Sequence, residues 1–533
     1  MTKKQLNFLI VQADQLAARA LAVYGNPVCR TPNLDSVAAT GTVFKHSYCN
    51  YPLCGPSRAS MMTGLLPFQG GFFDNGTEYP ATIPSFAHYL RMLGYQTCLS
   101  GKMHFIGPDQ LHGFEERLTS DIYPSDFNWM SNWTQGDKKT VANRLLAAQG
   151  EVQGIKNSGI YERTVQLDYD EEVVFKSVRK IHDYARSDDP RPFCLVTSLT
   201  HPHDPFAVPQ EYWDRYRHDE IDMPVIPRGD AGELDAHSRR LYDHIGVAAA
   251  DMSDAEIRTA RHAYYAAISF IDDQLGKLIH ALEVAGVREN TAIIFVSDHG
   301  EALGERGLWF KRSFYDVALN IPMIVSVPGM DQAPISNSNA SLVDLLPTLV
   351  DLAAPKDGLS RITTRYSGKS LVPAMHGQEA SPDDDIVFCE MAGDGLTVPA
   401  VAVLDGRMKY IHCDTDPALM FDRSVDPHEK INLVGNPDYA RAEAKFRRII
   451  SETWDFEALT EQVLECQRSR RIVENAHSEG TTPSWDFDQF IPGSTQYFRA
   501  LPINPSASNY SSTFKVRLRP DSDRPNERAM RAY

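Results

Sequence analysis

Three short apolar runs, each ending in polar residues, constrain the fold of this chain more than any other feature. They are Asn7–Ala13, Phe193–Leu199 and Thr291–Val296. Unbroken apolar runs of this length are typical of strands buried on both faces of a parallel or mixed sheet. Amphipathic helical patterns lie between them, for example at Ile83–Leu93 and Arg258–Ala285. This alternation predicts an α/β fold, with a large mixed, mostly parallel sheet flanked by helices.

The polar residues that follow these runs are suited to binding a metal ion or moving a proton. Asp14 follows the first run, His201 follows the second, and Asp298 and His299 follow the third. In open sheets of this kind, ligands bind beyond the carboxyl ends of the strands. We therefore expect a site at that edge. Singly, each residue also has an ordinary explanation, such as a helix N-cap for Asp14.

The pattern of the sequence changes near Ile386. Residues 401–404 and 408–412 flank an Asp-Gly pair, which predicts a β-hairpin with a tight turn. Residues 418–422 favour a further strand and residues 439–457 a helix. These features predict a smaller C-terminal antiparallel sheet packed on the first.

The chain is therefore expected to comprise three parts. Residues 1–385 would form the catalytic α/β domain, 386–484 a smaller α+β domain, and 485–533 an extended C-terminal tail rich in Pro, Ser, Asn and Arg. A tail of this length suits an arm that wraps a neighbouring subunit, so we expect a homo-oligomer, either a dimer or a tetramer.

Composition limits the partners and the location of the protein. The 533 residues carry a formal net charge of −17 and no polybasic run, which argues against nucleic acid or an anionic membrane as a partner. The apolar run near the N-terminus is too short for a secretory segment. The eight cysteines lack the spacing of a disulfide scaffold or a zinc pair. We expect a cytoplasmic protein with free thiols.

One segment points to a specific chemistry. Cys54 is followed by Pro56 two residues later and by Arg58 four residues later. This spacing resembles the signature of the sulfatase family, in which the cysteine is oxidised after translation to formylglycine. Further elements of that family appear in the same order, namely Gly101-Lys102-Met103-His104, His201 after its strand, and Ser297-Asp298-His299-Gly300-Glu301 followed by a segment ending at Lys311.

The resemblance implies two sets of residues. The cofactors would be the formylglycine from Cys54 and one divalent metal ion, with Ca²⁺ favoured and Mg²⁺ and Mn²⁺ as alternatives. The metal ligands would be Asp14, Cys54, Asp298 and His299. The catalytic residues would be Cys54, Arg58, Lys102, His104, His201 and Lys311.

The family mechanism then assigns roles to these residues. The hydrated formylglycine at position 54 attacks sulfur with Asp298 as a candidate base, and His201 protonates the departing alcohol. His104 takes a proton from the remaining hydroxyl, which expels sulfate. Lys102, Lys311 and Arg58, together with the metal ion, neutralise the negative charge of the sulfate group.

Other stretches favour one branch of the family. Many sulfatases have two consecutive aspartates after the first strand, whereas Asp14 is followed by Gln15 here. This variant, and the stretches 100–118 and 121–127, are similar to choline sulfatases. The small-molecule substrate would then be choline sulfate, whose quaternary ammonium favours an aromatic face. Trp129 is the candidate wall, and Asn75 and Glu390 would add polar and anionic groups.

Four alternatives remain open at this level. Another small alkyl or zwitterionic sulfate ester is one substrate, and a phosphonate monoester or phosphodiester is another, because the enzymes that hydrolyse them resemble sulfatases. A non-catalytic binding protein would result if Cys54 were never oxidised. A phosphatase with a hydroxyl nucleophile ranks lowest because it needs Ser or Thr at position 54.

Overall fold

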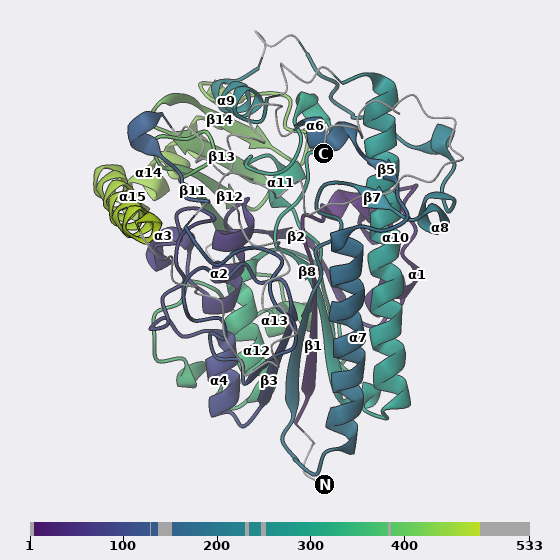
Figure 1. The fold of residues 1–533 in the computed structure, drawn as a ribbon. Coiled ribbons are helices and arrows are strands. Elements are labelled where there is room, and N and C mark those ends of the chain that lie inside the picture. The colour runs from purple at the N-terminus through teal and green to yellow at the C-terminus, as the bar shows by residue number, and fades with distance from the viewer. Residues whose placement is uncertain are drawn as a thin grey trace.

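The computed structural model describes residues 5–127, 129–136, 152–229, 234–246, 252–381 and 385–479. A large sheet flanked by helices forms one part, and a second, smaller sheet lies beside one end of it (Figure 1). This arrangement confirms the predicted fold class. The tail predicted at 485–533 lies outside the described residues.

The large sheet has eight strands in the order β10-β2-β9-β8-β1-β6-β3-β4. Strand β1 pairs in parallel with β8 and β6, while β9 runs antiparallel to β8 and β2. The sheet is therefore mixed and mostly parallel, as predicted. Its strands are β1 Asn7–Ala13, β2 Thr42–Tyr48, β3 Gln96–Gly101, β4 Glu116–Arg117, β6 Phe193–Ser198, β8 Thr291–Ser297, β9 Met323–Ser326 and β10 Ile335–Ser341.

Helices cover both faces of this sheet, which explains why β1 is apolar throughout. Phe8 and Ile10 belong to a hydrophobic cluster on one face, and Leu9 and Val11 belong to a second cluster on the other. Helices α2 Cys54–Thr63, α4 Phe86–Met92 and α12 Leu345–Ala353 pack on the first face, and α1 Pro32–Ala39, α7 Val165–Arg186 and α10 Asp254–Val284 pack on the second (Figure 1).

The smaller sheet is antiparallel, with its four strands in sequence order. Leu404 pairs with Lys409 and Asp405 with Met408, which confirms the predicted hairpin. The strands are β11 Ile386–Met391, β12 Ala400–Asp405, β13 Met408–Cys413 and β14 Asp416–Asp422. The shorter elements of the structure are α3 Pro67–Gly70, α6 Val152–Lys156, β5 Gly159–Ile160, β7 Ala207–Val208, α8 Gln210–Trp213, α9 Ala236–His244, α11 Asp316–Leu319 and α13 Val372–Met375.

The helix predicted at 439–457 is interrupted. Helix α14 spans Ala440–Thr453, and a second helix, α15, spans Phe456–Ser478. The side chain of Asp455 accepts a hydrogen bond from the Ala458 N–H and so caps the start of α15. Helix α15 lies at the outer edge of the molecule beside α14 (Figure 1).

The two sheets share one hydrophobic core. The cluster that contains Phe44 and Leu346 of the large domain also contains Val403 and Met420 of the small sheet. A domain boundary near residue 385 stays a prediction, and the shared core implies that the two parts do not fold independently. None of the described helices is both long enough and apolar enough to cross a membrane.

The close approach of β3 to β6 generates a stability prediction. Gly101 has φ of +109°, and a Cβ added there would lie 1.9 Å from the backbone oxygen of Ser198. Replacing Gly101 with Ala should therefore lower the free energy of unfolding by roughly 2 kcal/mol or more, measured by chemical denaturation. Gly154→Ala in α6, where no atom lies within 4 Å of the added Cβ, should have little effect. Equal stability of both variants would contradict this.

Candidate active site

The site begins where β1 and β8 end side by side. Ala13 and Ser297 are paired in register, so Asp14 and Asp298 leave the sheet at the same edge. The Gln15 N–H donates to Asp298 Oδ1 at 3.0 Å, and the Leu16 N–H donates to Ser297 Oγ at 2.8 Å. These hydrogen bonds fix the two strand ends relative to each other, as the strand pattern predicted.

Helix α2 brings the third component of the site to this edge. Cys54 is its first residue and lies buried at the helix N-terminus, where the helix dipole favours negative charge. Arg58, one turn later, donates from Nε to Asp298 Oδ2 at 2.9 Å and from Nη2 to Asp14 Oδ2 at 3.2 Å. The guanidinium has no solvent exposure. It ties the helix to both strand ends.

The four predicted metal ligands come together. One ligand atom from each of Asp14, Cys54, Asp298 and His299 lies within 4.8 Å of the others, and all four residues are buried. His299 donates from Nδ1 to the Gly300 oxygen at 3.1 Å, which leaves Nε2 facing Cys54 Sγ at 3.2 Å. Two carboxylates and a neutral imidazole nitrogen fit a divalent cation, with residue 54 completing the set.

Two buried lysines flank this group. Lys102, which follows β3, forms an ion pair with Asp14, and its Nζ lies 3.8 Å from Cys54 Sγ. Lys311 donates from Nζ to Gln15 Oε1 at 2.5 Å. The Gln15 side chain also donates to Glu301 Oε2 at 2.5 Å. At the position where many sulfatases have a second aspartate, this chain has Gln15, whose amide holds Lys311.

The positive charges shift the ionisation of the acidic groups. Burial alone would raise the pKa of Asp14, but Lys102 and, more weakly, Arg58 bring the pKa down to about 2. Burial likewise opposes ionisation of Cys54, yet Lys102 and Lys311 hold the pKa of its thiol well below the usual value. The buried lysines around residue 54 thus stabilise a negative charge at this position.

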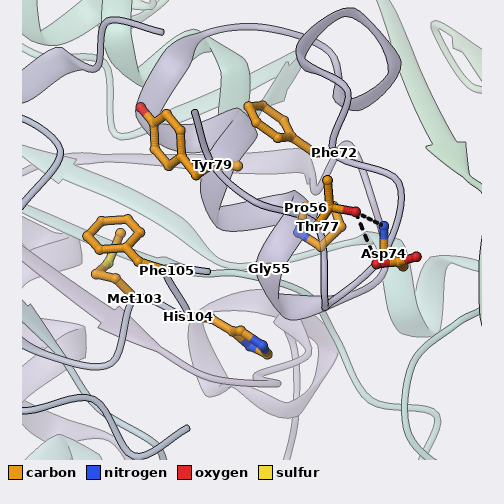
Figure 2. Close-up of a pocket in the computed structure, with 10 residues that line it drawn as sticks. Gly55, Pro56, Phe72, Asp74, Thr77, Tyr79, Met103, His104 and Phe105 are labelled. Atoms are coloured by element: carbon orange, nitrogen blue, oxygen red, sulfur yellow. Dashed lines mark hydrogen bonds between the residues drawn. The ribbon is translucent and has the colours of Figure 1, made fainter. Parts of the chain in front are cut away.

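His104 lies near position 54 and lines a cavity with Gly55 and Pro56. Its backbone has φ of +58°, and its N–H donates to Asp121 Oδ2 at 2.9 Å. Figure 2 shows the imidazole lining a cavity with Gly55 and Pro56 at the start of α2, and with Phe72 and Tyr79. Asp121, which the sequence did not single out, fixes the turn that presents His104.

The role of His201 stays a prediction, and the structure shows how this side chain is held. Its Nδ1 lies 2.7 Å from Asp170 Oδ2, and its ring packs on Phe270 at 4.8 Å between centroids. His203 instead places Nε2 2.8 Å from Lys311 Nζ. The backbone N–H of His201 also donates to Asp170, so this ring is held toward α7 and the next imidazole of the loop reaches the site.

Two of the predicted substrate-binding residues lie near this cluster. Asn75 Oδ1 accepts a hydrogen bond from the Gly55 N–H at 2.8 Å, beside Cys54. Trp129 packs against Tyr123, with 6.1 Å between ring centroids. Tyr123 in turn lies under Lys102, whose Nζ is 4.0 Å from the ring centroid. The sequence analysis did not single out Tyr123, although it falls in the stretch 121–127 that is similar to choline sulfatases.

Glu390, the third predicted substrate-binding residue, is directed elsewhere. It is 1% exposed, and its carboxylate accepts hydrogen bonds from the Phe68 N–H and from Trp454 Nε1, each at 2.6 Å. Burial raises its pKa to about 7. Both carboxylate oxygens therefore already accept hydrogen bonds, one from α3 and one from Trp454, and we do not retain Glu390 as a substrate ligand.

Comparison with known proteins defines the class of this protein. The family model described as "Sulfatase" matches residues 6–355, and a model described as "Choline sulfatase enzyme C terminal" matches residues 461–501. The chain therefore belongs to the sulfatase family and is a sulfuric ester hydrolase. A third model, for the C-terminal part of N-sulphoglucosamine sulphohydrolase, matches residues 304–455.

Individual relatives refine this assignment. The chain is 38% identical to the choline-sulfatase of Rhizobium meliloti (strain 1021), over 94% of this chain and 96% of the relative. It is 27% identical to an arylsulfatase of Clostridium perfringens, over 83% and 93%. The structure of a phosphonate monoester hydrolase from Silicibacter pomeroyi superposes with a TM-score of 0.66 at 22% identity, covering 83% of this chain and 94% of the neighbour, which shows the shared fold.

The ligand geometry predicts metal-dependent stability. Adding Ca²⁺ to metal-stripped protein at about 100 times its dissociation constant should stabilise the fold by roughly 2.7 kcal/mol, read as a rise in melting temperature. Asp298→Asn should lose most of this rise. Asp168→Asn, an exposed position ion-paired with Arg163, is the matched control and should keep it. An unchanged rise in the Asp298 variant would remove this residue from the ligand set.

Proposed function

We propose that this sulfatase hydrolyses choline sulfate to choline and sulfate, with a formylglycine formed from Cys54 and one divalent metal ion, for which Ca²⁺ is favoured. The observation that carries the substrate assignment is the 38% identity to a choline-sulfatase over nearly the whole length of both chains. The match of residues 461–501 to the C-terminal choline sulfatase model supports it.

Asp14, Asp298, His299 and residue 54 would hold the metal ion. Bound there, the ion would supply Lewis-acid stabilisation of negative charge on the sulfate oxygens. The formylglycine hydrate would supply the nucleophilic hydroxyl at position 54. Arg58 keeps both carboxylates oriented through the contacts at 2.9 and 3.2 Å.

The two lysines and the helix N-terminus would bind the sulfate group. Lys102 and Lys311 are at most 5% exposed, so their charges act in a site with little water. A preorganised cation in such an environment stabilises the charge of the transition state more strongly than it would in solution. Lys102 and Lys311 both act on position 54, since both lower the pKa of the Cys54 thiol.

Cleavage of the ester S–O bond leaves an alkoxide, which needs a proton. We assign the donor to His203 in place of His201. His203 Nδ1 donates to the Asp204 backbone oxygen at 2.8 Å, and Nε2 lies 2.8 Å from Lys311 Nζ. As an imidazolium, with Lys311 directed to the sulfate oxygens, His203 would carry on Nε2 the proton that passes to the alkoxide. His104, which lines the cavity beside Gly55, would take up the proton released when sulfate is expelled.

The cationic end of the substrate would lie against Trp129. A quaternary ammonium gains up to about 2 kcal/mol on a desolvated aromatic face. Trp129 is linked through Tyr123 to Lys102, so a choline group on the indole is within reach of a sulfate bound at the lysines. Asn75, fixed at Gly55, would separate the two parts of the substrate.

Two alternative activities have specific support. The likeness in fold to a phosphonate monoester hydrolase favours phosphonate monoesters or phosphodiesters as competing substrates. Another small alkyl sulfate ester would use the same lysines and metal site. The homo-oligomer and the cytoplasmic location stay predictions.

The activity is tested with a panel of choline sulfate, 4-nitrophenyl sulfate and a phosphonate monoester. The purified enzyme should show its highest kcat/KM on choline sulfate, because only this ester uses both the anionic and the cationic subsites. Cys54→Ala should abolish turnover on all three, since it removes the nucleophile, and the metal-free variant should keep the melting temperature of the metal-free wild type. Mass spectrometry should find an aldehyde at position 54 in the native host. Turnover retained without the side chain would exclude residue 54 from the mechanism.

Removing the aromatic wall should separate charged from uncharged substrates. Trp129→Ala should lower kcat/KM for choline sulfate by roughly 30-fold, the equivalent of about 2 kcal/mol, and should hardly affect 4-nitrophenyl sulfate. Trp213→Ala is the control, because this indole stacks on His262, with 3.6 Å between centroids. Equal losses on both esters would reassign Trp129 to packing.

A further inference from the structure

A buried ion pair joins helix α15 to the neighbourhood of the active site. Arg470 of α15 donates from Nη1 to Asp74 Oδ1 at 2.6 Å and from Nη2 to Asp74 Oδ2 at 2.9 Å. The side chains are 6% and 1% exposed. A bidentate contact of this kind fixes the direction as well as the distance between two groups. The residues are 396 positions apart in sequence, so the pair constrains the tertiary structure.

The Asp74 carboxylate also holds the polypeptide around it. It accepts hydrogen bonds from the Gly76 N–H at 3.0 Å, from Thr77 Oγ1 at 3.0 Å and from the Ser131 N–H at 3.2 Å. Figure 2 shows Asp74 and Thr77 joined beside Gly55. The Asp74 side chain thus links the segment 74–77, the backbone at residue 131 and helix α15 by hydrogen bonds.

The segments at 74–77 and 129–131 carry Asn75 and Trp129, the two side chains proposed above to contact the substrate. Asn75 is the neighbour of Asp74 and holds the Gly55 N–H. A Cβ on Gly76 would lie 2.6 Å from the Met130 nitrogen and 2.9 Å from the Trp129 carbonyl carbon, so the segments touch backbone to backbone. A displacement of Asp74 would therefore move Asn75 and Trp129 together.

A second contact from the same helix supports this link. Gln467, three residues before Arg470 and on the same helix face, accepts a hydrogen bond from the Trp133 N–H at 2.9 Å. The Gln467 side chain is buried. Helix α15 therefore holds the segment after Trp129 directly at Trp133 and, through Asp74, at Ser131. The helix from residue 461 onward, which includes Gln467 and Arg470, also lies within residues 461–501, which match the choline sulfatase C-terminal model.

We propose that Arg470 is a positioning residue for substrate specificity, which acts through Asp74 to place Asn75 and Trp129 against the cationic end of the substrate. This inference rests on the proposed choline sulfate activity. The proposed sulfate-binding cluster is held in place by Arg58, which pairs with Asp14 and Asp298 at the strand ends. Loss of Arg470 should therefore affect recognition of the cation far more than reaction at sulfur.

The test compares Arg470→Leu with Arg468→Leu. Arg468 lies on the same helix, is 67% exposed and pairs with Glu465, so it is the matched control. Arg470→Leu should lower kcat/KM for choline sulfate by roughly 10- to 100-fold, mainly through KM, because misplacement of about 1 Å has effects of that size. Turnover of 4-nitrophenyl sulfate should change little. Equal losses on both esters would overturn the inference.

Further variants separate positioning from stability. Arg470→Leu leaves the Asp74 charge buried and unpaired, whereas the double variant Arg470→Leu with Asp74→Asn removes that charge. The double variant should regain much of the melting temperature and keep the choline sulfate defect, and Arg470→Lys should lie between the wild type and Arg470→Leu. Full recovery of choline sulfate turnover in the double variant would show that stability alone was affected. A wild type without preference for choline sulfate would overturn the proposed function before any variant is compared.

Discussion

The active site depends on one buried guanidinium. Arg58 lies between Asp14 and Asp298, without solvent exposure, and ties the first turn of α2 to the ends of β1 and β8. Two buried carboxylates a few ångströms apart repel each other and lose their hydration, so they remain ionised only with a paired cation. Through this pairing, the residues at the ends of β1 and β8 and the residues at the start of α2 form one site.

The same balance of charge connects stability with catalysis. Lys102 and Arg58 hold the pKa of Asp14 near 2, so the carboxylate stays ionised and available to a metal ion at neutral pH. Since folding lowers this pKa, the associated stability is present above the ordinary pKa of Asp and is lost as the pH falls toward 2. The positive groups that stabilise the ligand set also suit the sulfate anion, so binding requires little reorganisation.

Specificity has a different structural origin. The groups proposed to bind the sulfate lie at the end of β3, at the start of α2 and, for Lys311, on the loop after β8. Asn75 and Trp129, which are proposed to contact the cation, lie on loops that are held by distant contacts. Asp74 joins these loops to Arg470 of α15, a helix that follows the small antiparallel sheet. The smaller sheet also shares its core with the large one. The C-terminal part of the chain therefore bears on the shape of the substrate site.

The sequence by itself determined the buried strands, the 401–412 hairpin and the cluster of Asp14, Cys54, Asp298 and His299, because apolar runs and short motifs express local constraints. It did not anticipate that His203 reaches Lys311, since His201 and His203 lie two residues apart and only the contact of the first with Asp170 directs the second to Lys311. It also misjudged Glu390, whose two hydrogen bonds come from residues remote in sequence. Tertiary structure decided these points, because the direction of a buried polar side chain is set by the partners that compensate its lost hydration.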